Sequence, residues 1–254
     1  MKPRSYITFP IFDKFSDLIC VLSTRSGGYS QGIYGSQNMG LRSGDTVSVV
    51  EKNRKQFFGL FKISQQQIAF TDQIHSANVA VADRSGVYPA SDALVTSQTG
   101  QFLAIQTADC LPVFVVDPEN RVIAAVHAGW RGVQAGIISR VIAVMTGTWQ
   151  LDPQKFYAAV GPGLQKECFE VGADVAGLFP RTFLSDHRDP AKSYLDLAGY
   201  TVSLLRQAGI PDSQIENNGA CTMCDQGAYY SYRRDKMQSG RMIGIIGMTG
   251  ENKL

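Results

Sequence analysis

The sequence has 254 residues, of which 44% are hydrophobic and 18% are charged, and its formal net charge is +2. This composition is typical of a chain with a packed core and argues against an intrinsically disordered protein. The small net charge, without a continuous basic run, argues against a protein that binds nucleic acid or an anionic membrane surface.

The N-terminus and the cysteines bear on the cellular compartment. Basic residues near the N-terminus are not followed by an apolar segment, so a secretory signal is not expected. The longest apolar stretch, residues 102–116, is too short to cross a membrane and contains Gln106 and Asp109. Five cysteines, an odd number, do not suggest a disulfide framework. We therefore expect a cytoplasmic protein.

The first third of the chain predicts a strand, a loop and a helix. Residues 18–23 have the apolar character of a strand, and a glycine-containing loop follows at residues 24–30. Asp45 is placed to cap a helix that runs to about residue 61.

The middle of the chain predicts a series of short strands. They are expected at residues 67–70, 79–82, 93–96, 103–106, 113–117 and 122–126. The sequence Pro118-Glu119-Asn120 predicts a hairpin turn between the last two. A helix is expected to begin after Gly132, because apolar residues then recur at three- and four-residue spacing.

The last third mixes strands and helices. Strands are expected at residues 156–160 and 241–248, and helices at residues 171–179 and 196–208. No regular strand–helix alternation, repeat or linker is visible. We therefore predict a single domain over residues 1–254 with an α+β fold, in which a mixed β-sheet is layered with helices, rather than a Rossmann sheet.

Two of the three histidines and one cysteine are candidate metal ligands. His75, Cys110 and His127 each lie at the end of a predicted strand, where side chains of neighbouring strands can converge. Two imidazoles and one thiolate suit Zn²⁺ and leave a fourth position open, as in catalytic zinc sites. The same donors suit copper. The alternative interpretation is a buried cysteine with two hydrogen-bonded histidines.

A second chemistry uses the same residues. Cys110 is a candidate nucleophile with His127 as its base, as in cysteine hydrolases. Asp109 cannot share a strand face with Cys110, because neighbouring side chains alternate. It is a candidate to orient a histidine ring by contacting the ring nitrogen that does not bind the metal. The alternative interpretation is an ordinary acid at a strand end.

Two glycine-rich segments are candidates for anion binding. Residues 127–132 join a strand to a helix and contain Arg131, which is suited to clamp a phosphate or carboxylate. Arg25 precedes Gly27 and Gly28 in a similar arrangement. Asn38 is a candidate for binding a sugar or a base edge, although such amides more often hold a loop together.

Several aromatic residues are candidates to stack on a planar base, although aromatics this sparse are more often part of the core. They are Tyr29, Tyr34, Trp130 and Phe169.

The remaining cysteines and histidine carry weaker signals. Cys221 and Cys224 resemble half of a zinc knuckle, and without a second pair we interpret them as structural or incidental. Cys20 and Cys168 have no identifiable partner in the sequence. His187 lies in a polar stretch and is predicted to be a solvated loop residue.

Taken together, the motifs are specific. RSGGYS, SQN, DQIH, SDALVT, TADCLPV, HAGWRG, GPGLQKECFEVG, CTMC and YSYRRD…SGRM occur in this order. The series resembles the laccase-domain family, also called the multicopper polyphenol oxidase or purine nucleoside phosphorylase family, from about Thr24 to Met248.

The resemblance implies a cofactor, a fold and an activity. It implies one zinc ion, with copper also possible, held by His75, Cys110 and His127, in an α/β–β sandwich similar to that of cysteine-hydrolase toxins. It also implies phosphorolysis of adenosine, inosine and methylthioadenosine, and deamination of adenosine. The expected partners are a small nucleoside and phosphate, without nucleic acid or membrane, in a monomer or weak homodimer.

On this basis we predict a zinc-dependent purine nucleoside enzyme. Its predicted catalytic residues are Cys110, His127, Asp109 and Arg131, and its predicted substrate-binding residues are Arg25, Asn38 and Gln73. The alternatives are a cysteine hydrolase or amidase, a copper-dependent polyphenol oxidase, and a non-enzymatic metal- or nucleotide-binding protein. Three histidines are too few to ligate a multicopper cluster, which disfavours the oxidase.

Overall fold

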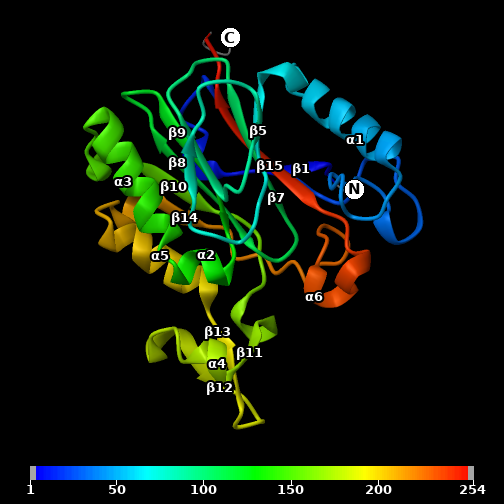
Figure 1. Ribbon diagram of the computed structural model, residues 1–254, viewed down its shortest axis with the longest axis vertical. Helices are drawn as coiled ribbons and strands as arrows, with labels where there is room; N and C mark the ends of the chain where they lie inside the picture. Colours follow the sequence, from blue (N-terminus) through cyan, green and yellow to red (C-terminus); the bar gives the residue numbers. More distant parts are fainter. Residues whose placement is uncertain (1–3, 251–254) are drawn as a thin grey trace.

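A computed structural model describes residues 4–250, in which two six-stranded sheets pack face to face between helices (Figure 1). The first sheet has the order β1 (Tyr6–Thr8), β2 (Leu18–Ser23), β15 (Met242–Met248), β7 (Phe102–Thr107), β3 (Ile68–Thr71), β5 (Gly86–Tyr88). The second has the order β14 (Ile215–Asn217), β10 (Tyr157–Val160), β8 (Leu111–Asp117), β9 (Val122–Ala128), β6 (Ala93–Thr96), β4 (Val79–Val81).

Residues 4–250 contain six α-helices: α1 (Val47–Gly59), α2 (Trp130–Gln134), α3 (Ile137–Trp149), α4 (Ala173–Ala176), α5 (Leu197–Gln207) and α6 (Tyr232–Asp235). The three long helices cover the outer faces of the two main sheets, whereas α4 packs on a smaller third sheet (Figure 1). Helix α1 packs on the first sheet through Phe57 and Phe58, whereas α3 and α5 pack on the second. The predicted α+β fold with layered mixed sheets is confirmed.

Alternation along β8 explains why this strand is apolar throughout. Phe114 and Val116 point into the core between the two sheets, while Val113 and Val115 point into the core under α3 and α5. A strand buried on both faces is expected to be continuously apolar. The β8–β9 pair, in the middle of the second sheet, therefore packs against both cores.

The predicted hairpin between β8 and β9 is confirmed. The Asp117 carboxylate accepts hydrogen bonds from the backbone N–H groups of Glu119 and Asn120, both at 3.0 Å. Arg121 completes the turn with a φ of 58°. The helix expected after Gly132 is instead two helices, α2 and α3, because Gly136 adopts a φ of 86° between them.

The cap predicted for the first long helix is wrong. Thr46 occupies the N-cap position of α1 without a side-chain capping bond. Within the described residues, Asp45 Oδ1 accepts only from the backbone N–H of Thr46, at 2.7 Å. Its Oδ2 accepts hydrogen bonds from Ser30 Oγ at 2.6 Å and Asn38 Nδ2 at 3.1 Å. The side chain that the local pattern assigned to helix capping therefore makes tertiary contacts with the preceding loop.

A small third sheet protrudes from the main body below α5 (Figure 1). It contains β11 (Glu170–Gly172), β13 (Lys192–Leu195) and β12 (Leu184–Asp186) in that order. The helix predicted at residues 171–179 is therefore wrong in its first part, because Val171 pairs with Ser193 across β13. Within residues 4–250 we find no helix with the length and apolar character of a membrane span.

Candidate metal centre

The structure brings His75, Cys110 and His127 together at the ends of three strands. His75 follows β3, Cys110 immediately precedes β8, and His127 lies in β9. Their ligand atoms all lie within 4.8 Å of one another. The centroids of the two imidazole rings are 4.8 Å apart and the rings are inclined by 80°. Three donors at these separations are within reach of a single ion.

The backbone around this cluster adopts rare conformations. His75 has a φ of 61° and Asp109 a φ of 92°. Both lie in the left-handed region, which residues other than glycine rarely adopt. Such conformations each cost on the order of 1–3 kcal/mol and persist where surrounding contacts enforce them, often at functional sites. The fold therefore constrains the two loops that present His75 and Cys110.

Gly129 makes room for the ligands. A Cβ atom at this position would lie 3.0 Å from Cys110 Sγ and 3.2 Å from His75 Cδ2. Both separations are shorter than ordinary van der Waals contact. The glycine after β9 therefore allows the thiol and the imidazole to approach the start of α2.

The buried carboxylate of Asp92 holds the ring of His127 and the backbone of His75. Its Oδ1 lies 2.8 Å from His127 Nδ1, and the same oxygen accepts a hydrogen bond from the His75 N–H at 2.9 Å. Its Oδ2 accepts from the N–H and the hydroxyl of Ser76 at 2.7 and 2.8 Å. With Nδ1 held by a carboxylate, His127 presents Nε2 to the cluster, which is the arrangement found behind many metal-bound histidines.

Electrostatic interactions favour a thiolate at this site. Burial alone would raise the pKa of Cys110, but the charge and hydrogen bond of His127, with a hydrogen bond from His75, lower this pKa to about 6. Burial would lower the pKa of His127, but Cys110 and Asp92 raise it to about 9. The site therefore holds the negatively charged sulfur of Cys110 beside the positively charged, protonated ring of His127. A metal ion can take the place of the proton on that ring.

The Asp109 carboxylate accepts hydrogen bonds from other groups than the histidine rings. Its Oδ1 accepts from Thr222 Oγ1 at 2.6 Å and its Oδ2 from the backbone N–H of Arg233 at 2.5 Å. The histidine-orienting carboxylate is Asp92, which sequence reasoning did not single out. The signal was present in the SDALVT motif, where an acid directly precedes a buried strand.

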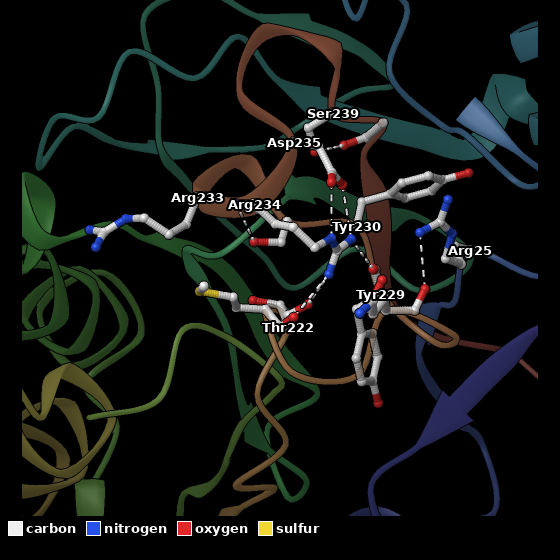
Figure 2. Close-up of polar contacts among 12 residues, drawn as sticks. Arg25, Thr222, Tyr229, Tyr230, Arg233, Arg234, Asp235 and Ser239 are labelled. Atoms are coloured by element: carbon white, nitrogen blue, oxygen red, sulfur yellow. Dashed lines mark hydrogen bonds and ion pairs between the residues drawn. The ribbon is translucent and has the colours of Figure 1, made fainter. Parts of the chain in front are cut away.

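The three predicted substrate-binding residues lie in the protein's own hydrogen-bond network. Gln73 joins the ends of β3 and β7, since its amide both donates to and accepts from the backbone of Gln106. Asn38 is fully buried and accepts from the N–H of Arg241 at 2.9 Å. Arg25 donates to the carbonyl oxygens of Gly35 and Gln226 and stacks on Tyr230, beside which Figure 2 shows it.

Two further arginines lie near the candidate centre. Arg131, a predicted catalytic residue, is exposed on α2 and stacks on the Trp130 ring at 4.2 Å. Arg241, which sequence reasoning missed, is half-buried and interacts electrostatically with Cys110 and Asp109. Burial lowers the pKa of Arg241, and these neighbours oppose the shift. The SGRM motif contains this arginine, but nothing local distinguishes it from a surface residue.

The aromatic residues proposed for base stacking are spread over different environments. Tyr29 is 41% exposed, with the Lys52 ammonium 3.7 Å from its ring centroid. The Tyr34 hydroxyl donates to the Ser43 carbonyl at 2.8 Å. Phe169 is buried in the core beneath the second sheet.

Two sequence-based expectations outside the centre are wrong. The His187 side chain is only 5% exposed, and its Nε2 lies 3.1 Å from a Glu170 carboxylate oxygen, so it is not a solvated loop residue. Cys168, for which no partner was identified, lies with its sulfur 3.3 Å from that of Cys224. Both contacts join segments that only the third sheet and its connections bring together.

Comparison with known proteins assigns the chain to a family. Residues 19–249 match the family described as multi-copper polyphenol oxidoreductase laccase. A protein of Deinococcus radiodurans named purine nucleoside phosphorylase is 39% identical over 228 residues, which cover 89% of this chain and 87% of that protein. A Haemophilus influenzae protein of the same name is 33% identical over 231 residues, 88% of this chain and 91% of its own length.

Solved structures agree with this assignment. The crystal structure of YlmD from Geobacillus stearothermophilus superposes with a TM-score of 0.91 at 28% identity and covers 98% of both chains. That of a Bacillus licheniformis hypothetical protein, YfiH, has the same score and identity and covers 96% of this chain and 97% of its own. The resemblance inferred from the motifs is thus confirmed, and the chain belongs to the multi-copper polyphenol oxidoreductase laccase family.

Proposed function

We propose that this protein is a purine nucleoside phosphorylase with one catalytic zinc ion held by His75, Cys110 and His127. The observation that carries the proposal is the convergence of these three ligand atoms within 4.8 Å, with Asp92 fixing the ring of His127. Three protein ligands leave a fourth coordination position for a reactant, which distinguishes a catalytic zinc site from a structural one.

The donor set fits a single zinc ion better than a multicopper cluster. Two imidazoles and a thiolate are good zinc donors, and the low pKa of Cys110 provides the thiolate that a metal requires. Copper accepts the same donors, so it remains an alternative ion for this one position. When bound, the ion supplies a Lewis acid that stabilises negative charge on a reacting oxygen.

The positive charge beside the centre supports a phosphate-dependent reaction. Arg241 approaches Cys110 and Asp109, and the exposed Arg131 follows the β9 ligand by four residues along the chain. A guanidinium binds phosphate through paired charge-assisted hydrogen bonds. In phosphorolysis a phosphate oxygen attacks the anomeric carbon of the nucleoside, the glycosidic bond breaks, and the base leaves with a proton. The products are a free base and a ribose 1-phosphate.

The names of the relatives support the same reaction class, since proteins from several bacteria that match most of this chain are called purine nucleoside phosphorylase. We propose adenosine, inosine and methylthioadenosine as substrates. Deamination of adenosine, in which water replaces the exocyclic amino group and ammonia leaves, is proposed as a second activity of the same centre.

The test is product analysis with adenosine and phosphate on zinc-loaded protein. The wild type is expected to form adenine and ribose 1-phosphate, and Cys110→Ala is expected to lose at least 100-fold in rate, because removing a ligand disables the metal site. Cys20→Ala, which removes a buried thiol from strand β2, is the matched control. Normal ribose 1-phosphate formation by zinc-loaded Cys110→Ala would refute the proposal.

A second candidate function rests on two of these residues, Cys110 and His127, together with Asp92. The Cys110 thiolate, the His127 imidazole and the Asp92 carboxylate form a nucleophile–base–orienter arrangement, as in cysteine hydrolases. Such an enzyme would attack an amide carbonyl, release the amine and hydrolyse the thioester with water. This alternative predicts full amidase activity in the presence of a chelator and irreversible loss of that activity when Cys110 is alkylated. The phosphorylase predicts loss of activity in the chelator and recovery with Zn²⁺.

A further inference from the structure

A second cluster of potential metal ligands lies away from the candidate centre. Cys168, Cys221 and Cys224 have sulfur atoms that all lie within 4.8 Å of one another. Cys168 ends a short 3-10 helix, Lys166–Cys168, that leads into the small third sheet. Cys221 and Cys224 lie in the loop between β14 and α6. Two separate segments of chain thus place three sulfurs at one point.

The pKa values of two of these thiols are shifted in opposite directions. Burial alone would raise the pKa of Cys221, but hydrogen bonding with the backbone at Gln165, Cys224 and Met223 lowers it. The pKa of Cys168 is raised instead, by burial and by its two cysteine neighbours. Like charges at this distance oppose one another, so the three thiols cannot all ionise unless a cation joins them.

We propose that Cys168, Cys221 and Cys224 form a second metal site, which binds one thiophilic ion, Zn²⁺ or Cu⁺, through three thiolates. Binding releases the three thiol protons and forms three metal–sulfur bonds without any change of oxidation state. Zinc–sulfur bonds of about 2.3 Å require sulfur–sulfur separations of about 3.8 Å in a tetrahedral site. The sulfur–sulfur separations are compatible with that value, at 3.3 Å for Cys168 and Cys224 and no more than 4.8 Å for the other two pairs.

The surroundings balance the charge of such a site. Three thiolates carry a net charge of −1 around Zn²⁺ and of −2 around Cu⁺. The Arg233 guanidinium donates to the carbonyl oxygens of Glu170 at 3.0 Å and Cys168 at 3.5 Å, so its positive charge lies close to the backbone that carries one of the three sulfurs. Figure 2 shows that its side chain extends away from the neighbouring Arg234.

The loop that carries the cysteines also contacts the first centre. Thr222, between the two cysteines, donates to Asp109, the residue before Cys110. Arg234 holds the same loop through the carbonyl oxygens of Thr222 and Met223 at 3.0 and 3.1 Å (Figure 2). An ion at the second site would therefore fix the third sheet and the Thr222–Asp109 contact together.

Metal counting tests the proposal without relying on activity. Reduced full-length protein, stripped with a chelator, is titrated with Zn²⁺ against a chromophoric indicator, and in a parallel arm with Cu⁺ against a Cu⁺-specific chelator. Wild type is expected to bind two ions. Cys224→Ser and Cys168→Ser are each expected to bind one, while His75→Ala loses the other ion and keeps the three-thiolate site. Cys20→Ala, the matched cysteine control, is expected to bind two.

Two further readouts keep the test decisive if a variant folds poorly. With Co²⁺, sulfur-to-metal charge-transfer absorption is expected to be stronger in His75→Ala, which keeps three thiolate ligands, than in Cys224→Ser, where the first centre has one. In wild type, bound Zn²⁺ is expected to protect Cys168, Cys221 and Cys224 from alkylation. A single ion per wild-type chain that is lost in His75→Ala and kept in Cys224→Ser, unprotected cysteines, or a Cys168–Cys224 disulfide in the same reducing buffer would each overturn the proposal.

Discussion

Asp92 Oδ1 lies 2.8 Å from Nδ1 of His127, and the Asp92 carboxylate is completely buried. The same carboxylate accepts hydrogen bonds from the backbone of His75 and from Ser76. One side chain on the approach to β6 thus fixes the ring of one candidate ligand and the backbone of another. This carboxylate therefore constrains the positions of two of the three candidate ligands.

Asp92→Asn is expected to lower zinc affinity by about 10- to 100-fold, as measured for residues that support metal-bound histidines. An amide is a weaker acceptor for the His127 N–H and does not balance its charge. Competition with a chromophoric chelator measures the affinity. Asp117→Asn, which alters another fully buried carboxylate in the β8–β9 turn, is the control and should keep wild-type affinity. Equal affinities for wild type and Asp92→Asn would show that Asp92 does not support the metal.

The stability of the metal-free protein is expected to depend on Asp92 in acid. Burial would raise the pKa of Asp92, but hydrogen bonds from His127 and Ser76 lower it to about 2, below the value of about 3.9 for an unfolded chain. A carboxylate with a lowered pKa stabilises the fold above the unfolded pKa, and this contribution disappears as pH falls from about 4 to about 2. The contribution is on the order of 2 kcal/mol.

Urea unfolding of metal-free wild type and Asp92→Asn at pH values between 5 and about 2.5 measures this term. The free energies of unfolding should differ most near pH 5 and converge as the pH falls. A constant difference over the whole range would mean that the pKa of Asp92 is not lowered in the folded state.

Gly129→Ala is expected to weaken zinc binding and phosphorolysis by at least 10-fold while the protein still folds. The added Cβ would lie 3.0 Å from Cys110 Sγ and 3.2 Å from His75 Cδ2, so the ligands must move apart. Gly147→Ala, in an exposed and unobstructed part of α3, is the matched control. It should leave zinc binding unchanged and raise stability by roughly 0.5–1 kcal/mol, because alanine favours a helix more than glycine does. Unchanged zinc binding by Gly129→Ala would argue against the proposed ligand geometry.

Arg241→Gln is expected to raise the KM for phosphate by about 10- to 100-fold, the cost of one lost charged hydrogen bond. Its guanidinium is the half-buried positive charge that interacts with Cys110. Steady-state kinetics with phosphate varied at saturating nucleoside measures the effect, and Arg241→Lys should recover part of it. Arg140→Gln, an exposed position on α3, serves as the control. If Arg131→Gln raises the KM for phosphate and Arg241→Gln does not, the phosphate ligand is Arg131.

Much of the architecture could be read from local patterns. The buried strands β8 and β9 are nearly continuous apolar runs, and the turn between them contains Pro118 and Asn120. These features are local because backbone preference and hydrophobic pattern are properties of short sequence segments. The prediction failed at Val171, where pairing with β13 outweighs a helical pattern, as tertiary pairing often does.

The sequence by itself determined the chemical inventory: two histidines and a cysteine with the right donors, in motifs specific enough to identify the family. Only the tertiary structure decided which side chains support them. Asp92 reaches His127 because β6 and β9 are neighbours in one sheet, and Cys168 reaches Cys224 because the third sheet folds back beside the last loop. Strand order and loop packing arise from burial of the whole core, which no short stretch of sequence encodes.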